Sequence, residues 1–430
     1  MEMIDSELIS RLAQRYGTPY YVYDAAVIRR QIAALRSFDS IRFAQKANSN
    51  VHILRLMRSA GVWVDAVSAG EIQRALAAGY SGATTPAGLV YTADVLPADA
   101  LELVVGHGIP VNAGSLAMLD RLGRRSPGHP VWLRVNPGFG HGHSHKVNTG
   151  GVWSKHGIWY AELPEALARV GAYGLRLAGL HMHIGSGSDL EHLQRVCAAM
   201  VETVRLWHMD IAAISSGGGL PIPYRPNDLP FDTRAFFDLW HAARRQIESL
   251  VGHPVALETE PGRFLVAQAG WLVSQALVTK RVGDNHYVLV DAGFDNLVRP
   301  AMYGSYHEIS VIRPDGTPAT GPLRPTVVGG PLCEAGDVFT QDAAGSILPR
   351  ALPPIAVGDR LVFHDAGAYA ATMASTYNSR PLAPEILIDG DSVLLIRRRQ
   401  TMADLLALEL AMDGSPTSFA GSPSRDFADG

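Results

Sequence analysis

The chain has 430 residues, a formal net charge of −4, a hydrophobic fraction of 47 % and a charged fraction of 18 %. A chain of this length is too long to fold around one ordinary hydrophobic core, so we expect one large domain and a second domain. The charge argues against a nucleic-acid partner, and the absence of an eighteen-residue apolar run argues against a membrane span. The N-terminus does not resemble a signal peptide, and the two cysteines, Cys197 and Cys333, suit a reducing cytoplasm.

The N-terminal part of the chain predicts alternating strands and helices. A helix is expected over residues 6–16 and a strand over 20–23, separated by a Gly-Thr-Pro break. Further strands are predicted at 41–44, 62–67, 89–92, 110–112, 131–135, 177–184, 211–215 and 255–260. Helices are predicted at 27–35, 52–59, 71–78, 98–105, 116–122, 163–170, 190–207 and 233–250. Eight such units over about 240 residues predict an α/β fold, a (β/α)8 TIM-like barrel over residues 25–265.

The pattern changes after Phe264. Short β-type segments at 273–279, 286–291, 327–328, 360–364 and 392–396 are separated by Gly, Pro and Asp turns, and a helical period returns at 402–410. We predict a C-terminal β-sandwich or β-barrel domain of residues 266–412, which residues 1–24 join through an N-terminal strand. Residues 413–430 are rich in Ser, Pro, Gly and Asp and are expected to be a disordered tail.

Lys46 directly follows the first predicted barrel strand. The C-terminal ends of the strands are where such barrels carry their chemistry. Partial desolvation there would lower the pKa of the ammonium group, and the neutral amine could attack a carbonyl. A solvated or salt-bridged lysine is the alternative.

Other polar residues also collect at predicted strand ends. His181 and His183 end one strand, and the period of two places both imidazoles on one face. Glycine-rich turns follow the last three strands, at 184–187, 217–219 and 260–263. Their backbone N–H groups could bind a phosphate, with added charge from Arg263. This set suits pyridoxal phosphate, with Glu260 keeping the pyridine nitrogen protonated and His183 stacked on the ring.

Seven motifs together resemble the diaminopimelate decarboxylases, which belong to the alanine-racemase-like, fold-type-III pyridoxal-phosphate enzymes. They are FAQKA at 43–47, VSAGE at 67–71, HMHIGS at 181–186, GGG at 217–219, EPGR at 260–263, GPLCE at 330–334 and DAGAY at 365–369. The likeness extends over residues 16–410. The segment SKHG at 154–157 is similar to the enterobacterial-type branch, whereas many relatives carry Phe in place of His156.

The resemblance implies a role for each matched residue. Lys46, His183 and Cys333 would be catalytic, Lys46 by binding the cofactor covalently and Cys333 as proton donor. The implied cofactor-binding residues are Lys46, His183, Ser186, Gly218, Gly219, Glu260, Pro261, Gly262, Arg263 and Tyr369. The implied substrate-binding residues are Arg263, Arg299, Tyr303, Glu334 and Tyr369. Cys333 and Glu334 would come from the second subunit of a homodimer.

The implied reaction is decarboxylation of meso-2,6-diaminopimelate to L-lysine and CO2, the last step of lysine biosynthesis. The substrate has an amino-acid group at both ends, so arginines would suit its distal carboxylate and Glu334 its distal ammonium. A sister decarboxylase acting on ornithine, arginine, lysine or a carrier-linked amino acid is the alternative. Arg299 and the Cys333–Glu334 pair favour diaminopimelate, and the same pair argues against a racemase. A non-catalytic relative would have lost Lys46 or the proton donor.

Metal chemistry is not expected. His141, His143 and His145 could suggest a metal, but no Cys or carboxylate lies near them, and a polar active-site loop fits better. The His181/His183 pair resembles that of metal-dependent barrel hydrolases, which place it on the first strand, where Lys46 stands here. Cys197 is expected in the core. Asp65 could serve the cofactor pocket or cap a turn.

Overall fold

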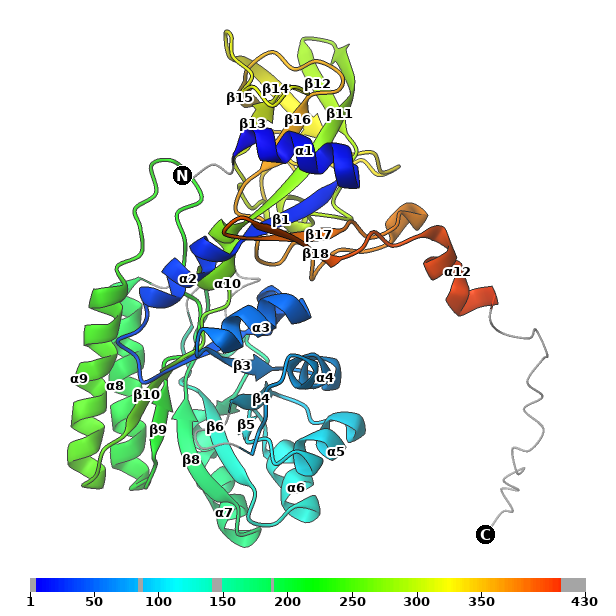
Figure 1. Cartoon of the computed structure of the whole chain (residues 1–430). Coiled ribbons are helices and arrows are strands. Elements are labelled where there is room, and N and C mark those ends of the chain that lie inside the picture. The colour runs from blue at the N-terminus through cyan, green and yellow to red at the C-terminus, as the bar shows by residue number, and fades with distance from the viewer. Residues whose placement is uncertain (1–4, 84–87, 141–148, 187–188, 411–430) are drawn as a thin grey trace, which may run out of the picture.

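The computed structural model describes residues 5–83, 88–140, 149–186 and 189–410. A barrel lies below a β domain in the view of Figure 1. The barrel wall consists of eight parallel strands: β2 (Ser40–Ala44), β3 (Trp63–Ala66), β4 (Leu89–Ala93), β5 (Val111–Ala113), β6 (Pro130–Asn136), β8 (Arg176–His181), β9 (Ala213–Ser215) and β10 (Ala256–Thr259). Pairing of β10 with β2, with Thr259 opposite Ile41, closes the barrel. The predicted (β/α)8 barrel is confirmed.

The barrel helices begin where their sequences place capping residues. In most of them an Asp, Asn or Ser side chain accepts a hydrogen bond from a first-turn N–H group. The capping residues are Asp24, Asn50, Ser68, Ser115, Asp189 and Asp232. The helices are α2 (Ala25–Ala33), α3 (Val51–Ser59), α4 (Ala69–Ala77), α5 (Ala98–Gly106), α6 (Leu116–Arg125), α7 (Leu163–Ala172), α8 (Leu190–Trp207) and α9 (Thr233–Val251).

The barrel strands are short, and the first of them is buried on both faces. All five residues of β2 are buried, as expected for a parallel sheet covered by helices. A buried ion pair between Arg42 and Glu258 joins the first and last strands. Cys197 is 7 % exposed and packs in the core, as predicted.

The second domain is a nine-stranded mixed sheet organised around the long strand β11 (Gly270–Val282). The N-terminal strand β1 (Tyr20–Asp24) pairs with β11 on one side and with β17 (Glu385–Asp389) on the other, so its predicted place in this domain is confirmed. Helix α1 (Ser6–Tyr16) packs its Ile9 and Leu12 on this sheet. The other strands are β12 (Asn285–Val290), β13 (Ile309–Ile312), β14 (Arg324–Gly329), β15 (Arg350–Leu352), β16 (Arg360–Phe363) and β18 (Ser392–Arg397). Helix α12 (Met402–Leu410) follows them, as predicted.

Several short elements of the structure were not predicted from the sequence. They are β7 (Ile158–Trp159), β13, β15, β17, α10 (Arg263–Val266) and α11 (Arg299–Tyr303). None exceeds five residues, and β17 depends on pairing with β1, more than 350 residues away. The strand predicted at 177–184 ends at His181, where its pairing with β9 ends. Within the described ranges, no helix is long and apolar enough to cross a membrane.

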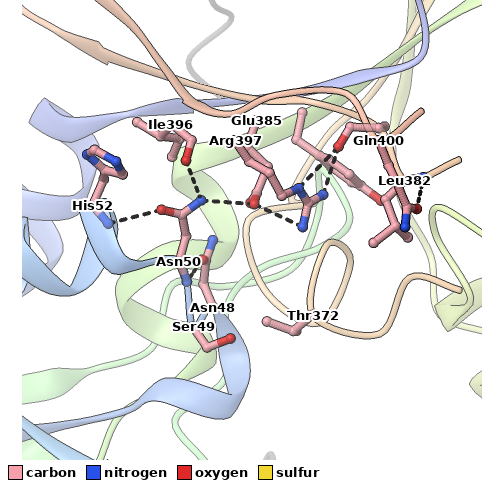
Figure 2. A network of polar contacts seen from close by, with 12 residues as sticks. Asn48, Ser49, Asn50, His52, Thr372, Leu382, Glu385, Ile396, Arg397 and Gln400 are labelled. Carbon is pink, nitrogen blue, oxygen red and sulfur yellow. Dashed lines mark hydrogen bonds and ion pairs between the residues drawn. The ribbon is translucent and has the colours of Figure 1, made fainter. Parts of the chain in front are cut away.

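A polar network joins the two domains just after Lys46 (Figure 2). Asn50 caps α3 and donates from Nδ2 to Oε1 of Glu385 at 2.9 Å. Arg397 lies 3.1 Å from the same oxygen, and the Tyr23 hydroxyl donates to the other one at 2.6 Å. One buried carboxylate therefore joins β1, the segment after Lys46 and β18.

Candidate active site

The C-terminal ends of the barrel strands surround a cavity of about 270 Å³. Its walls come from the barrel and from two segments of the β domain, 299–305 and 369–373. The lining residues are Ala44, Lys46, Asp65, Val67, Thr92, Arg134, Thr149, His181, His183, Ser186, Gly218, Gly219, Glu260, Gly262, Arg263, Arg299, Tyr303, Ser305, Tyr369 and Met373. A neighbouring cavity of about 720 Å³ shares Lys46, Val67, Thr92 and Arg134 with it.

Lys46 lines both cavities and is exposed to them. It lies in a 3₁₀ turn, Gln45–Ala47, rather than at the last position of β2. The Lys46 side chain is exposed in the described structure, whereas the sequence led us to expect a partly desolvated ammonium group. The backbone of this turn is held from the β domain, since the backbone N–H of Tyr369 and the hydroxyl of Thr372 donate to the carbonyl of Ala47 at 2.9 and 3.3 Å.

Glu260 is the ionised carboxylate of the cavity. His181 Nε2 lies 2.8 Å from one of its oxygens, and Ser215 Oγ donates to the other at 2.8 Å. Burial opposes ionisation, but the His181 imidazole and the two hydrogen bonds lower the pKa of Glu260 to about 2. We call Glu260, His181, Ser215 and Asp65 the glutamate cluster.

Asp65 behaves in the opposite way. Burial and the charge of Glu260 raise its pKa well above the ordinary value, although Thr92 and Lys46 oppose this. Its Oδ1 is buried without a hydrogen-bond partner in the described part of the chain. The two carboxyl groups are thus driven to different protonation states, which leaves Glu260 as the charged partner for a cationic ring nitrogen.

His183 supplies a neutral aromatic face. Burial and the charges of Arg134 and Lys46 lower its pKa well below the ordinary value. His181 and His183 line the same cavity, as the strand period predicts, although His183 lies beyond the end of β8.

The glycine turn after β9 fits closely against the neighbouring turns. A Cβ atom on Gly218 would lie 2.4 Å from the carbonyl oxygen of Glu260, and one on Gly219 would lie 2.2 Å from that of Gly185. Gly219 also has a φ of +90°. Only glycine satisfies both conditions, and its exposed backbone leaves room for a phosphate at the cavity wall.

Two arginines with aromatic neighbours line the rest of the cavity. Arg263 Nη1 donates to the Tyr224 hydroxyl at 2.6 Å, and its guanidinium carbon lies 5.5 Å from the ring centre of Tyr369. The guanidinium carbon of Arg299 lies 5.0 Å from the ring centre of Tyr224. Burial and the charge of Arg263 lower the pKa of Arg299. We call Arg263, Arg299, Tyr224 and Tyr369 the arginine cluster.

The arginine cluster has no internal counterion. Within the described residues, no carboxylate lies within ion-pair distance of Arg263 or Arg299. Buried charges without a partner are costly, so this cluster is suited to bind an anionic ligand.

Three of the predicted site residues do not line the cavity. Pro261 precedes the turn that does, and Cys333 and Glu334 are exposed on the β domain. Several residues that the fold brings there had no predicted role, namely Thr92, Arg134, Thr149, Ser215, Tyr224, Ser305 and Met373. A position at a strand end could have indicated Thr92, Arg134 and Ser215, whereas the others lie in loops.

Metal ligands do not gather in the described part of the chain, where no group of three His, Cys, Asp or Glu side chains could hold an ion. His141, His143 and His145 lie outside the described residues, as does the predicted tail.

Comparisons with known proteins identify the family. Residues 24–267 match the family model of the pyridoxal-dependent decarboxylase, pyridoxal binding domain. The chain is 59 % identical to the diaminopimelate decarboxylase of Streptomyces coelicolor over 423 residues, which cover 98 % of this chain and 96 % of the relative. The chain belongs to the diaminopimelate decarboxylase family.

Solved structures of this family have the same fold. A crystal structure of diaminopimelate decarboxylase, 59 % identical, superposes with a TM-score of 0.92 and covers 94 % of this chain and 96 % of its own. The diaminopimelate decarboxylase of Helicobacter pylori, solved in complex with L-lysine, is 30 % identical, with a TM-score of 0.82 over 94 % of this chain and 99 % of its own.

The residues present fit the cofactor of a pyridoxal-dependent family. The cavity combines an exposed lysine, an ionised carboxylate, a neutral imidazole and a glycine turn with no room for a Cβ atom. These are the amine, the ring-nitrogen partner, the stacking face and the phosphate-binding backbone that pyridoxal phosphate requires.

Proposed function

We propose that this chain is a pyridoxal-phosphate-dependent decarboxylase that converts meso-diaminopimelate to L-lysine and CO2. One observation carries the proposal: a single cavity is lined by a lysine and an ionised glutamate and also by two arginines without internal counterions. The first pair suits the cofactor, and the second suits a carboxylate at the far end of the substrate.

The glutamate cluster would hold the cofactor. Lys46 would bind it covalently, and Ser186, Gly218, Gly219, Gly262 and Arg263 would surround its phosphate. When bound, pyridoxal phosphate withdraws electrons from the reacting carbon, which permits the loss of CO2. Glu260 would keep a proton on the pyridine nitrogen, since its own pKa is about 2. The neutral His183 would lie against the ring face.

The arginine cluster would select the substrate. Arg263, Arg299, Tyr303 and Tyr369 would bind the distal carboxylate, and the aromatic rings would exclude water from it. A substrate with a bare distal amine would leave the guanidinium groups unpaired, so ornithine or lysine should be poor substrates.

The test is CO2 release by the purified protein with added pyridoxal phosphate. We expect release from meso-diaminopimelate, with L-lysine as product, and little from L-lysine, L-ornithine or L-arginine. CO2 release mainly from a monocarboxylic amino acid would agree with the proposed cofactor but would contradict the proposed role of Arg299.

We also propose that the active site is completed in a homodimer. Cys333 and Glu334 are exposed in the chain, and both lie outside the cavity lining. Cys333 of a second copy would protonate the reacting carbon after CO2 loss, and Glu334 would bind the distal ammonium group.

Complementation tests the shared site. Lys46→Ala and Cys333→Ala variants, each inactive alone, should regain about a quarter of wild-type activity when mixed as equal parts and allowed to exchange subunits, because half of the dimers then contain one intact site. No recovery despite exchange would place Cys333 in the cavity of its own chain or outside the mechanism.

Two further parts of the proposal concern organisation. We propose that residues 25–265 form the cofactor-binding domain and that residues 1–24 and 266–412 form the β domain, a division that the 24–267 family match supports.

We propose a cytoplasmic location, which the two free cysteines support. Limited proteolysis and cell fractionation test these two points.

A further inference from the structure

His307 contacts Arg299 from outside the cavity. Arg299 Nη1 lies 2.9 Å from His307 Nε2, and His307 Nδ1 lies 2.7 Å from the backbone carbonyl oxygen of His364. A carbonyl oxygen only accepts, so Nδ1 carries the ring proton and the lone pair of Nε2 faces Arg299. These two contacts fix the tautomer of His307 and the orientation of the guanidinium group together.

The histidine is itself held by a buried framework. It is 3 % exposed, and the ring of Tyr224 meets it edge-on with centroids 5.8 Å apart. His364, which provides the carbonyl, receives a hydrogen bond from Trp271 Nε1 at 3.2 Å and contacts Ser310 Oγ at 2.7 Å. The support of Arg299 therefore extends into β11, β13 and β16 of the β domain.

The partner of Arg299 is neutral. Burial and the charge of Arg299 lower the pKa of His307 well below its ordinary value. Burial raises the pKa of the Asp365 carboxyl group to about 7, although the charge of Arg299 opposes this shift. Asp365 forms no ion pair with Arg299. A carboxylate in place of His307 could also hold the guanidinium group, but it would compete with an anionic ligand for the same charge.

We propose that His307 is a positioning residue that orients Arg299 without neutralising it, and so sets the preference for a substrate with a distal carboxylate. The inference rests on the proposed function and deepens it. It makes the β domain, through His307 and His364, part of the specificity of the site.

The test compares three variants of the full-length holoenzyme: His307→Leu, His307→Gln and His307→Glu. For each, KM and kcat for meso-diaminopimelate are measured, with the inhibition constant of cadaverine, which, unlike the product L-lysine, lacks the distal carboxylate. We expect His307→Leu to raise KM about 10- to 100-fold with kcat nearly unchanged, because a charged contact loses its orientation. The inhibition constant of cadaverine should stay within about threefold, since it does not use that contact.

The other two variants separate orientation from charge. His307→Gln keeps a neutral acceptor and should recover a KM within about fivefold of wild type, whereas His307→Glu adds a competing charge and should raise KM at least as much as His307→Leu. His129→Leu is the matched control, since His129 is also buried and contacts a carbonyl, that of Ile109, at 2.8 Å but does not line the cavity. It should lower the unfolding temperature and leave KM unchanged.

The outcomes distinguish the two proposals. If the wild-type protein releases no CO2 from meso-diaminopimelate, the proposed function fails and the inference fails with it. If the wild type is active but His307→Leu keeps its KM, or raises the cadaverine inhibition constant in parallel, only the positioning role is overturned. Should His307→Leu fail to fold, equal KM values for the Gln and Glu variants would overturn it.

Discussion

At the glutamate cluster, Glu260 is paired with His181 and Ser215 within the chain, whereas at the arginine cluster Arg263 and Arg299 have only aromatic and neutral partners among the described residues. In the proposed function, the first arrangement would fix a charge that is needed whenever the cofactor is bound. The second would keep a charge available for a ligand that arrives and leaves in each turnover. The difference shows how one cavity can hold a resident group tightly and still discriminate between substrates.

The comparison predicts that the most damaging change lies beside the glutamate cluster. Lys46→Ala should lower turnover by about 10⁴-fold or more, because the amine that binds the cofactor covalently is lost. The absorbance of the covalently bound cofactor should disappear as well. Retention of that absorbance would show that a different lysine holds the cofactor.

Glu260→Gln should have the next largest effect. It removes the charge that would hold a proton on the ring nitrogen, and we expect turnover to fall about 10²- to 10³-fold while cofactor binding persists. Absorbance spectra and steady-state kinetics measure the two properties. Near-normal turnover would point instead to Asp65 as the partner of the ring nitrogen.

Glu260 also predicts a pH dependence of stability. Its pKa in the folded chain, about 2, is below the ordinary value of 4.5. The ionised group therefore stabilises the folded state at pH values above 4.5. That contribution is lost as the pH falls from about 4.5 toward 2. Unfolding measured at pH 7 and pH 3 should show a smaller difference for Glu260→Gln than for wild type.

Arg299→Gln tests the arginine cluster. We expect KM for meso-diaminopimelate to rise about 100-fold, since one charged contact to the distal carboxylate is lost. The cofactor absorbance and the inhibition constant of cadaverine, which lacks the distal carboxylate, should change little. An equal loss for both ligands would mean that Arg299 holds the site together rather than selecting the substrate.

The smallest effect on turnover is expected away from both clusters, at the domain junction. Glu385→Gln should reduce the free energy of unfolding by about 1–3 kcal/mol, because Arg397 loses its buried counterion. Asp389→Asn on the same strand is the control, since its ion pair with Arg29 is largely exposed and should contribute little. Thermal unfolding measures both, and equal values would remove the special role of Glu385.

The sequence predicted the barrel well because its strands and helices repeat a local pattern. Short apolar strands and capping residues such as Asn50 and Ser68 mark the elements without any tertiary information. Strand β17 was missed because it depends on pairing with β1 from the other end of the chain. The α/β barrel with an accessory β domain was therefore predictable, and the order of strands in the second sheet was not.

The site was predictable where motifs carry it. Lys46, His183 and Glu260 follow barrel strands and line one cavity, in agreement with the sequence. Tyr224 and His307 lie in loops and act through contacts to arginines, so no spacing announces them. The 3₁₀ turn that contains Lys46 was also not foreseeable, because a hydrogen bond from Tyr369 of the β domain holds it.

The junction at Glu385 has a consequence for biosynthesis. Asn50 leaves the ribosome 335 residues before Glu385, its partner in the network after Lys46. At about 5–20 residues per second, this interval is about 20–70 s. Throughout that time the nascent barrel lacks the carboxylate that holds the segment after Lys46, so this junction forms only after Glu385 has been synthesised.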